Sequence, residues 1–260
     1  MLIVLSPAKS LDYDSPLATE KMSEPAMLDH AAKLVEIMAT KSPNQLAKLM
    51  GISPQLAELN FERFQNWERP FTIETARQAL LAFDGDVYMG LDARSFKQRD
   101  FTHAQKTVRI LSGLYGVLRP LDLMMPYRLE MGTKLKNPRG RDLYEFWGDR
   151  ITEELNAAMV ASPGEAVLIN LASNEYFKAV RTEVLETPVV TPVFLDAKGD
   201  GDHRVVSFFA KKARGAMAAW IVRNRVKKVA EFEDFDGMGY TFDPTRSTDA
   251  RPAFSRRNPA

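Results

Sequence analysis

The chain opens on an unbroken run of apolar residues, and this run limits the folds that the sequence can adopt. Residues 2–5 are all aliphatic, and Pro7 follows closely. A continuous apolar run of this length that ends near a proline is typical of a strand buried on both of its faces. We therefore expect the beginning of the chain to lie in the core of a sheet.

Strand-like and helix-like segments alternate along the rest of the chain. Apolar runs predict strands, and apolar residues at helical spacing predict helices. The expected strands are residues 108–111, 166–171, 189–195, 204–209 and 253–255, and the expected helices are residues 28–38, 73–82, 142–161 and 210–228. This pattern predicts an α/β fold, α+β-like in that helices surround a mixed sheet. We find no internal repeat and expect residues 1–260 to form one domain.

Residues 42–66 predict a helical hairpin inserted near the start of this domain. Ser42 and Ser53 each stand before a proline, as N-cap residues do at the start of a helix. Gly51 gives the turn between the two helices its backbone freedom. We expect the helices to place Leu46, Leu49, Leu56 and Leu59 on facing apolar stripes, and Ala47 and Ala57 to let the helices approach closely.

The pattern of this segment is typical of a helix-hairpin-helix, a motif that usually binds nucleic-acid phosphates without contacting the bases. The N-terminus of its second helix would then bind an anion. A hairpin that serves packing alone is an equal alternative, because the usual motif has a second glycine where this chain has Ser53. The residues expected to contact DNA lie at the turn and beside it: Lys48, Gly51, Ile52, Ser53 and Gln55.

Composition excludes several classes of site. The formal net charge is +1, so binding of a polyanion requires a local basic patch. The absence of cysteine excludes disulfides and thiolate metal sites, and the three histidines are far apart in the sequence. We therefore expect no metal site and no cofactor. The first residues do not resemble a signal peptide or a membrane span, so we expect a cytoplasmic protein that does not bind membranes. We also expect a monomer.

A long segment without acidic residues is the strongest charge asymmetry in the chain. Residues 203–230 contain eight lysines and arginines but no Asp or Glu. At 100° per residue, Lys211, Arg214 and Arg225 fall on one helix face, and Lys212 lies beside them. We expect these four residues to bind phosphates, with a solvated helix face as the alternative.

Polar residues near the ends of the predicted strands form a second candidate site. Ligands of α/β folds collect outside the carboxyl ends of strands, where arginines suit bidentate contacts and lysines suit point-charge contacts. Each residue alone is more simply an ion pair or a cap, but together they predict a cleft for an anionic ligand. The expected cleft residues are Ser6, Lys9, Ser112, Tyr115, Arg119, Arg128, Asn170 and Lys178.

The chain contains no nucleophile elbow, Walker loop or Rossmann glycine fingerprint. Two longer segments are distinctive: residues 112–122, which read SGLYGVLRPLD, and residues 126–131, which read PYRLEM. These segments closely resemble the YaaA family of bacterial peroxide-stress proteins. Other segments that resemble the family lie at residues 2–9, 142–149, 170–178 and 211–215, in the same order as in the family.

This resemblance implies a cytosolic protein that limits free iron and oxidative DNA damage under hydrogen peroxide. It implies binding of double-stranded or distorted DNA without strong sequence preference, through the hairpin around Gly51 and the cluster of Lys211, Lys212 and Arg214. It transfers no catalytic residues. The alternative is an enzyme that acts on a nucleotide-like or other anionic small molecule in the cleft, with Glu130 or Tyr115 as acid or base. Direct iron binding by the carboxylates of residues 231–236 is disfavoured, because oxygen ligands alone hold Fe(II) weakly.

Overall fold

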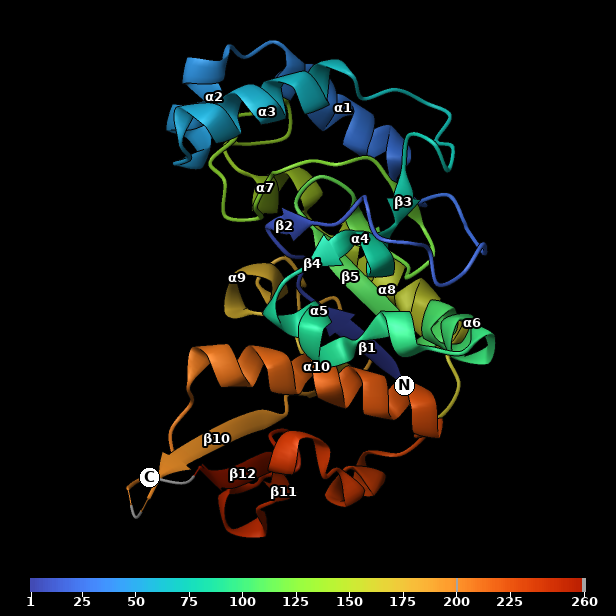
Figure 1. Cartoon of the computed structure of the whole chain (residues 1–260), viewed down its shortest axis with the longest axis vertical. Coiled ribbons are helices and arrows are strands. Elements are labelled where there is room, and N and C mark those ends of the chain that lie inside the picture. The colour runs from blue at the N-terminus through green and yellow to red at the C-terminus, as the bar shows by residue number, and fades with distance from the viewer. Residues whose placement is uncertain (200, 259–260) are drawn as a thin grey trace.

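In the computed structural model, which describes residues 1–199 and 201–258, a five-stranded sheet forms the centre of the protein (Figure 1). Its strands are β1 (Leu2–Leu5), β5 (Val108–Ser112), β6 (Gly116–Leu118), β8 (Leu168–Asn170) and β9 (Val189–Val190). The order is β6-β5-β1-β8-β9, and β1 pairs in parallel with both of its neighbours. β9 extends the parallel part of the sheet, whereas β6 is antiparallel to β5. The predicted mixed sheet is therefore confirmed.

The first strand lies in the core, as its apolar run predicts. All four residues of β1 have no exposed surface. The helix α6 (Gln98–Thr107) packs against β1 and β5, and α8 (Arg150–Ala161) packs against β6. Buried side chains of the sheet and of the surrounding helices belong to one continuous apolar cluster. Burial of this surface stabilises the fold by roughly 25 cal/mol per Å² of apolar area.

Three helices, α1 (Leu28–Ala39), α2 (Pro43–Met50) and α3 (Pro54–Gln65), lie together at one end of the molecule (Figure 1). The predicted helix starts are confirmed: the side chain of Ser42 accepts from the N–H of Gln45, and that of Ser53 accepts from the N–H of Leu56. Gly51 adopts the left-handed conformation, with φ of 62°.

The predicted packing of the leucines is correct for α2 but wrong for α3, although Ala57 of α3 is buried as expected. Leu46 is buried, whereas Leu56 and Leu59 are 39% and 41% exposed. α3 instead buries the face that carries Ala57, Asn60 and Phe64, which also recur at helical spacing. A leucine pattern alone did not reveal which face of a short helix meets its neighbours, because a small alanine allows a closer approach than leucine.

The predicted helix of residues 142–161 is interrupted. It consists of α7 (Leu143–Trp147) and α8, separated by Gly148, whose φ is 52°. The interruption lets the indole of Trp147 turn into the core, where its Nε1–H donates to the carbonyl oxygen of Gly113 at 3.0 Å. Tertiary packing of one large aromatic side chain thus overrides local helix propensity.

The predicted helix of residues 73–82 is largely wrong. Only its end is helical, as the short α4 (Ala79–Ala82), while β3 (Arg77–Gln78) pairs with β7 (Leu123–Met124). The side chain of Gln78 is fully buried and donates to the carbonyl oxygens of Thr19 and Lys21. Partners that are remote in sequence therefore hold this segment in an extended conformation.

The C-terminal part of the chain builds a second, three-stranded sheet. Its order is β10 (Val193–Lys198), β12 (Ala253–Asn258), β11 (Thr241–Phe242). The predicted strand of residues 204–209 is wrong: Arg204 makes one isolated bridge to Asp196, and Ser207 begins the long helix α10 (Ser207–Asn224). Two β-branched residues and two phenylalanines gave a strand-like pattern at what is the start of a helix.

The remaining elements are short. β2 (Ser10–Leu11) pairs with β4 (Phe83–Asp84), and α5 (Asp86–Leu91) follows. The others are α9 (Asn174–Phe177) and the 3-10 helices η1 (Ala93–Ser95), η2 (Val229–Asp234), η3 (Gly237–Gly239) and η4 (Pro244–Arg246). Among the described residues, no helix combines the length and the apolar character that crossing a bilayer requires.

α10 crosses α5 at very short range because glycines stand at the contact. A Cβ atom added to Gly215 would lie 1.8 Å from the carbonyl oxygen of Val87, and one added to Gly90 would lie 2.0 Å from that of Lys212. α10 also packs against β10, so it is buried on two sides rather than along one stripe. This close contact fixes the position of α10 relative to the first half of the chain.

We predict that Gly215→Ala destabilises the protein by at least about 2 kcal/mol, because the added methyl group forces two backbones apart. In an isolated helix the same change would stabilise by about 1 kcal/mol, so the sign of the effect is diagnostic. Urea denaturation measures it. Lys211→Ala, on the same helix with a half-exposed side chain, should change the free energy of unfolding by less than about 0.5 kcal/mol. Equal stability of the Gly215 variant and the wild type would contradict the close contact.

Candidate functional site: a cleft of mixed charge at the sheet edge

A polar cleft lies at the carboxyl edge of the parallel strands. From β1 the chain returns to the sheet as β5 on one side and later as β8 on the other, so the strand order reverses beside β1. Open α/β sheets bind ligands at such a switch point. Ser6 follows β1 and Ser173 follows β8, and both line a cavity of about 610 Å³, which we call the cleft.

Hydrogen bonds among the loops fix the floor of the cleft. The backbone N–H of Ser173 donates to the hydroxyl oxygen of Ser6 at 2.8 Å, and the Ser6 hydroxyl donates to that of Ser173 at 3.2 Å. The buried hydroxyl of Tyr88, on α5, donates to the carbonyl oxygen of Ser6 at 3.0 Å. Asn170 is buried just below and accepts from the N–H of Ala172 at 3.1 Å. These bonds join β1, β8 and α5 into one preorganised surface.

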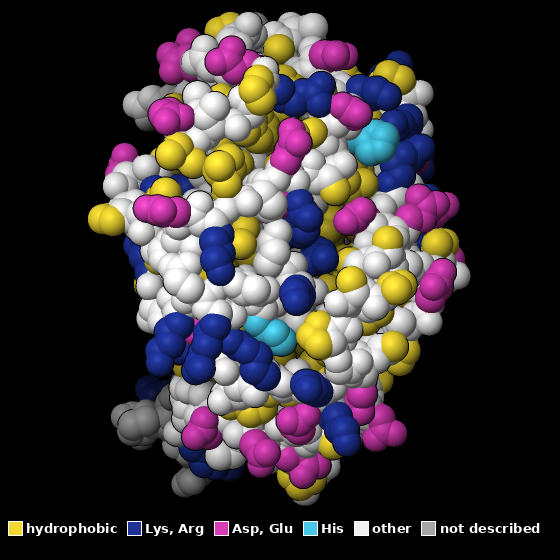
Figure 2. Space-filling model, turned by 90° about the vertical axis from the view of Figure 1, so that its right-hand side faces the viewer, with side chains coloured by type: hydrophobic (Ala, Val, Ile, Leu, Met, Phe, Trp, Pro, Cys, Tyr) yellow, Lys and Arg dark blue, Asp and Glu magenta, His cyan; other side chains and the backbone are white. Residues whose placement is uncertain are grey.

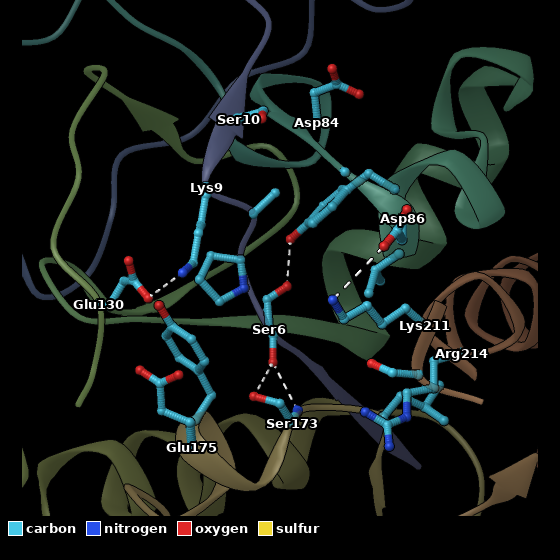
Figure 3. A pocket seen from close by; sticks show the side chains of 18 of the residues that line it. Ser6, Lys9, Ser10, Asp84, Asp86, Glu130, Ser173, Glu175, Lys211 and Arg214 are labelled. Carbon is cyan, nitrogen blue, oxygen red and sulfur yellow. Dashed lines mark hydrogen bonds and ion pairs between the residues drawn. The ribbon is translucent and has the colours of Figure 1, made fainter. Parts of the chain in front are cut away.

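Four basic side chains line the cleft. Figure 3 shows three of them around Ser6, with Lys9 on one side and Lys211 and Arg214 on the other, and Arg128 is the fourth. Lys9 and Arg128 share the carboxylate of Glu130, at 2.8 and 3.1 Å. Lys211 lies 3.8 Å from the carboxylate of Asp86.

Arg214 is the cation that the protein compensates least. Its guanidinium is mostly buried, and this burial lowers its pKa, although an arginine remains charged at any physiological pH. Among the described residues its side chain makes one hydrogen bond, to the carbonyl oxygen of Ala172 at 3.3 Å, and no ion pair. Arg128 likewise has a buried Nε–H without an acceptor in the described part of the chain. Desolvated donors of this kind favour an anionic ligand.

Carboxylates line the cleft as well as cations. Glu130 and Asp86 form the ion pairs described above, and Asp84 and Glu175 also face the cavity. The arrangement is therefore of mixed charge, with separate positive and negative parts. No group of three or more His, Asp or Glu side chains within residues 1–199 and 201–258 is arranged to hold a metal ion.

The cleft gathers residues from both sites that the sequence indicates. Ser6, Lys9 and Arg128 come from the predicted anion cleft, and Lys211 and Arg214 come from the predicted DNA surface. Sequence reasoning did not find Asp84, Asp86 and Tyr88, because they follow the segment that was expected to be a helix. The local signal was the Asp-Gly-Asp sequence at residues 84–86, which is typical of a turn.

The other predicted cleft residues lie outside the lining. Ser112 and Tyr115 are fully buried behind it, where the Ser112 hydroxyl is 2.6 Å from that of Tyr127. The Nε–H of Arg119 donates to Asp122 at 2.9 Å, and the ammonium of Lys178 lies 4.7 Å from the centre of the Tyr144 ring. Each of these side chains has a structural partner. Burial raises the pKa of the Tyr115 hydroxyl, which accepts from Trp67 and has no access to the cleft.

The hairpin does not line the cleft. Lys48, Gly51, Ser53 and Gln55 are exposed, and Ile52 is half-buried. Arg63, near the end of α3, is partly buried, and this burial lowers its pKa, with a smaller contribution from the charge of Arg128. The predicted DNA contacts at the turn therefore lie at the surface, outside the lining of the cleft.

Arg225 does not share a face with Lys211 and Arg214, so that prediction is wrong. It is the residue after the end of α10, has φ of 56°, and donates to the Asp100 carboxylate on α6 at 2.7 Å. The helix ends one turn earlier than the sequence indicates, which breaks the 100° progression. Lys212 points to a different side from Lys211, with its ammonium 4.4 Å from the centre of the Phe208 ring.

The side of the molecule that carries α6 is also rich in basic groups. Figure 2 shows Lys and Arg side chains that gather near the middle of this face, beside a histidine. Burial, together with the positive charges of Arg225 and Lys106, lowers the pKa of His103 to about 4. His103 is therefore neutral at physiological pH, and it is not a candidate cation for the cleft.

The comparison with protein families gives one match. The family described as peroxide stress protein YaaA matches residues 1–246 of the chain. The match covers all of the cleft residues and the hairpin.

We predict that Arg225→Ala raises the pKa of His103 above about 4, because a positive charge beside the imidazole is removed. Titration of the histidine ring protons by NMR measures this shift. Arg225→Lys, which keeps the charge, should leave the pKa close to that of the wild type. The wild type should also lose stability as the pH falls from 6.5 towards 4, because the unfolded state then binds a proton that the folded state excludes. An unchanged pKa in the alanine variant would place Arg225 away from His103.

Proposed function

Because the chain belongs to the YaaA family of peroxide stress proteins, we propose that it acts in the response to hydrogen peroxide by binding DNA without strong sequence preference. Membership of the family supports the role in peroxide stress. DNA is a polyanion, so the part of the chain that binds it must supply local positive charge, since the net charge is only +1. Four basic and four acidic side chains line the cleft, and of the four cations Arg214 is the one without a carboxylate partner among the described residues, so it offers that charge.

The uncompensated donors of Arg214 and Arg128 carry this proposal. Arg214 has no carboxylate partner among the described residues, and Arg128, which pairs with Glu130, has a buried Nε–H without an acceptor there. Buried donors of this kind are costly unless a ligand offers oxygen acceptors. Phosphate oxygens match the planar fork of arginine and accept two hydrogen bonds at once. Lys9 and Lys211 can exchange their carboxylate partners for phosphates, since both side chains are more than half exposed.

The neighbouring hairpin has a supporting part in this proposal. We assign α2 and α3 as a helix-hairpin-helix that contacts phosphates beside the cleft, through Gln55 and Lys48 near the turn. Residues 42–66 carry two basic and two acidic side chains, so their electrostatic contribution is small. The cleft therefore supplies most of the affinity, and the hairpin sets the direction of the bound strand.

Binding of this kind limits iron-driven damage without a metal site on the protein. DNA condenses cations along its backbone, Fe(II) among them, and each phosphate that a lysine or arginine neutralises releases its counterions. Fe(II) that has left the backbone reacts with peroxide away from the DNA. The proposed protection is thus a consequence of electrostatic displacement.

We predict that the protein binds unrelated DNA duplexes with similar affinity, and that the affinity falls steeply as the salt concentration rises. Arg214→Gln should weaken binding to every duplex by roughly tenfold, since a charge-assisted contact to phosphate is lost. Fluorescence anisotropy across a salt series measures both effects. Arg223→Gln is the matched control, because Arg223 lies on the same helix, lines no part of the cleft and pairs with Asp92. An affinity that does not change with salt concentration would exclude this mode of binding. So would binding of one duplex sequence alone.

We also predict that the protein protects plasmid DNA from strand breakage by Fe(II) and hydrogen peroxide. The variant Arg214→Gln should protect the plasmid less than the wild type does. Iron chelated by EDTA does not bind the DNA backbone, so it provides the control. If protection is equally strong with chelated iron, the protein shields DNA sterically rather than by displacing cations. Gel electrophoresis of nicked and supercoiled plasmid gives the readout.

A small anionic molecule is the second candidate ligand of the cleft. The cavity, at about 610 Å³, has the size of a small-molecule site, and hydroxyl groups line its floor. Glu130 is then the group positioned to move a proton. Thermal stabilisation by nucleotides, together with no binding of any duplex, would favour this function over DNA binding.

A further inference from the structure

The uncompensated charges of the cleft are of both signs. Arg214 has no carboxylate partner, and within residues 1–199 and 201–258 neither Asp84 nor Glu175 forms an ion pair. One oxygen of Glu175 accepts from the N–H of Gly132 at 2.9 Å. In Figure 3, Glu175 and Arg214 lie on opposite sides of Ser6, so an anionic part and a cationic part of the cleft are separated by its floor.

A groove for duplex backbone alone does not account for these carboxylates. The sugar-phosphate backbone presents only anions to the protein, and a carboxylate beside it repels it. A ligand that suits this cleft has an acidic group at one end and N–H donors at the other. The apolar side chains of Leu171, Val205 and Pro7 also line the cavity, and they offer a surface for a flat ring.

We propose that the cleft holds one unpaired nucleotide of the bound DNA, with its phosphate at Arg214 and Lys211 and the N–H groups of its base at Glu175. This inference rests on the DNA binding proposed above. A nucleotide joins an anionic phosphate to a base that carries amino or imino donors, which carboxylates accept. An unpaired base also costs little to remove from the stack, whereas a paired base must first be extruded. A free nucleoside monophosphate has the same chemistry, and the experiment separates the two sources.

The test compares three duplexes of equal length. One is fully paired, one contains a single unpaired deoxyadenosine, and one contains an unpaired abasic residue at the same place. We expect the unpaired adenine to bind roughly tenfold more tightly than the other two, since hydrogen bonds to a charged acceptor are added. The abasic duplex isolates the contribution of the base, because it keeps the same backbone distortion.

The variant Glu175→Gln gives effects of opposite sign. The amide oxygen can still accept from Gly132, but the negative charge is lost. We expect this variant to bind the duplex with unpaired adenine more weakly and the fully paired duplex more tightly. Glu153→Gln, on the exposed side of α8, should leave all three affinities unchanged. If Glu175→Gln tightened all three complexes alike, the carboxylate would only repel backbone and the inference would be wrong.

The failures of the two proposals are distinguishable. If the three duplexes bind equally while Arg214→Gln weakens them all, DNA binding stands and the nucleotide site does not. If no DNA binds, but deoxyadenosine monophosphate raises the melting temperature more than deoxyribose 5-phosphate does, the ligand is a free nucleotide and DNA is excluded as its source.

Discussion

Parallel pairing of β1 with β5 and β8 is the constraint on which the rest of the structure depends. The strand is fully buried, and its place in the middle of the sheet brings three connections to one edge. Ser6 and Ser173, 167 residues apart in sequence, meet there through two hydrogen bonds. Any ligand site that these loops form is therefore built at the ends of buried strands, on loops that hydrogen bonds hold together.

The contact between α10 and α5 brings charge to this edge. Gly215 and Gly90 let two backbones approach so closely that α10 has a fixed position over the end of the sheet. Lys211 and Arg214 stand on the part of α10 that passes the cleft, and Asp86 and Tyr88 of α5 join them from the other helix. The contact between α10 and α5 therefore has two results. It lets the two backbones pack directly through glycines, and it places the charged side chains of both helices in the cleft. The basic groups proposed to bind phosphate depend on glycines that never touch a ligand.

The sequence predicted the elements whose local pattern is strong, and it failed where remote partners decide. β1, α1 and the two capped helices of the hairpin are confirmed, because an apolar run and Ser-Pro caps act within a few residues. The helix expected over residues 73–82 is replaced mainly by an extended segment, because Gln78 bonds to a loop almost 60 residues away. The strand expected over residues 204–209 fails because Ser207 begins a helix that is buried on two sides. Local secondary-structure propensity predicts little where tertiary packing buries a segment on two sides.

The amino-acid sequence by itself determined the family, the α/β class and which side chains are charged, since these depend on residue identity and order. It also indicated two basic sites, one on a helix and one at strand ends. Only the tertiary structure decided that Lys211 and Arg214 stand in the same cleft as Lys9 and Arg128, and that Asp84 and Glu175 line it with them. It also decided that Arg225, after the end of α10, pairs with Asp100 of α6 and stands apart from the cleft. The physical reason is that a cleft is a relation between segments far apart in the chain, and its geometry follows from strand order and helix crossing rather than from any local pattern.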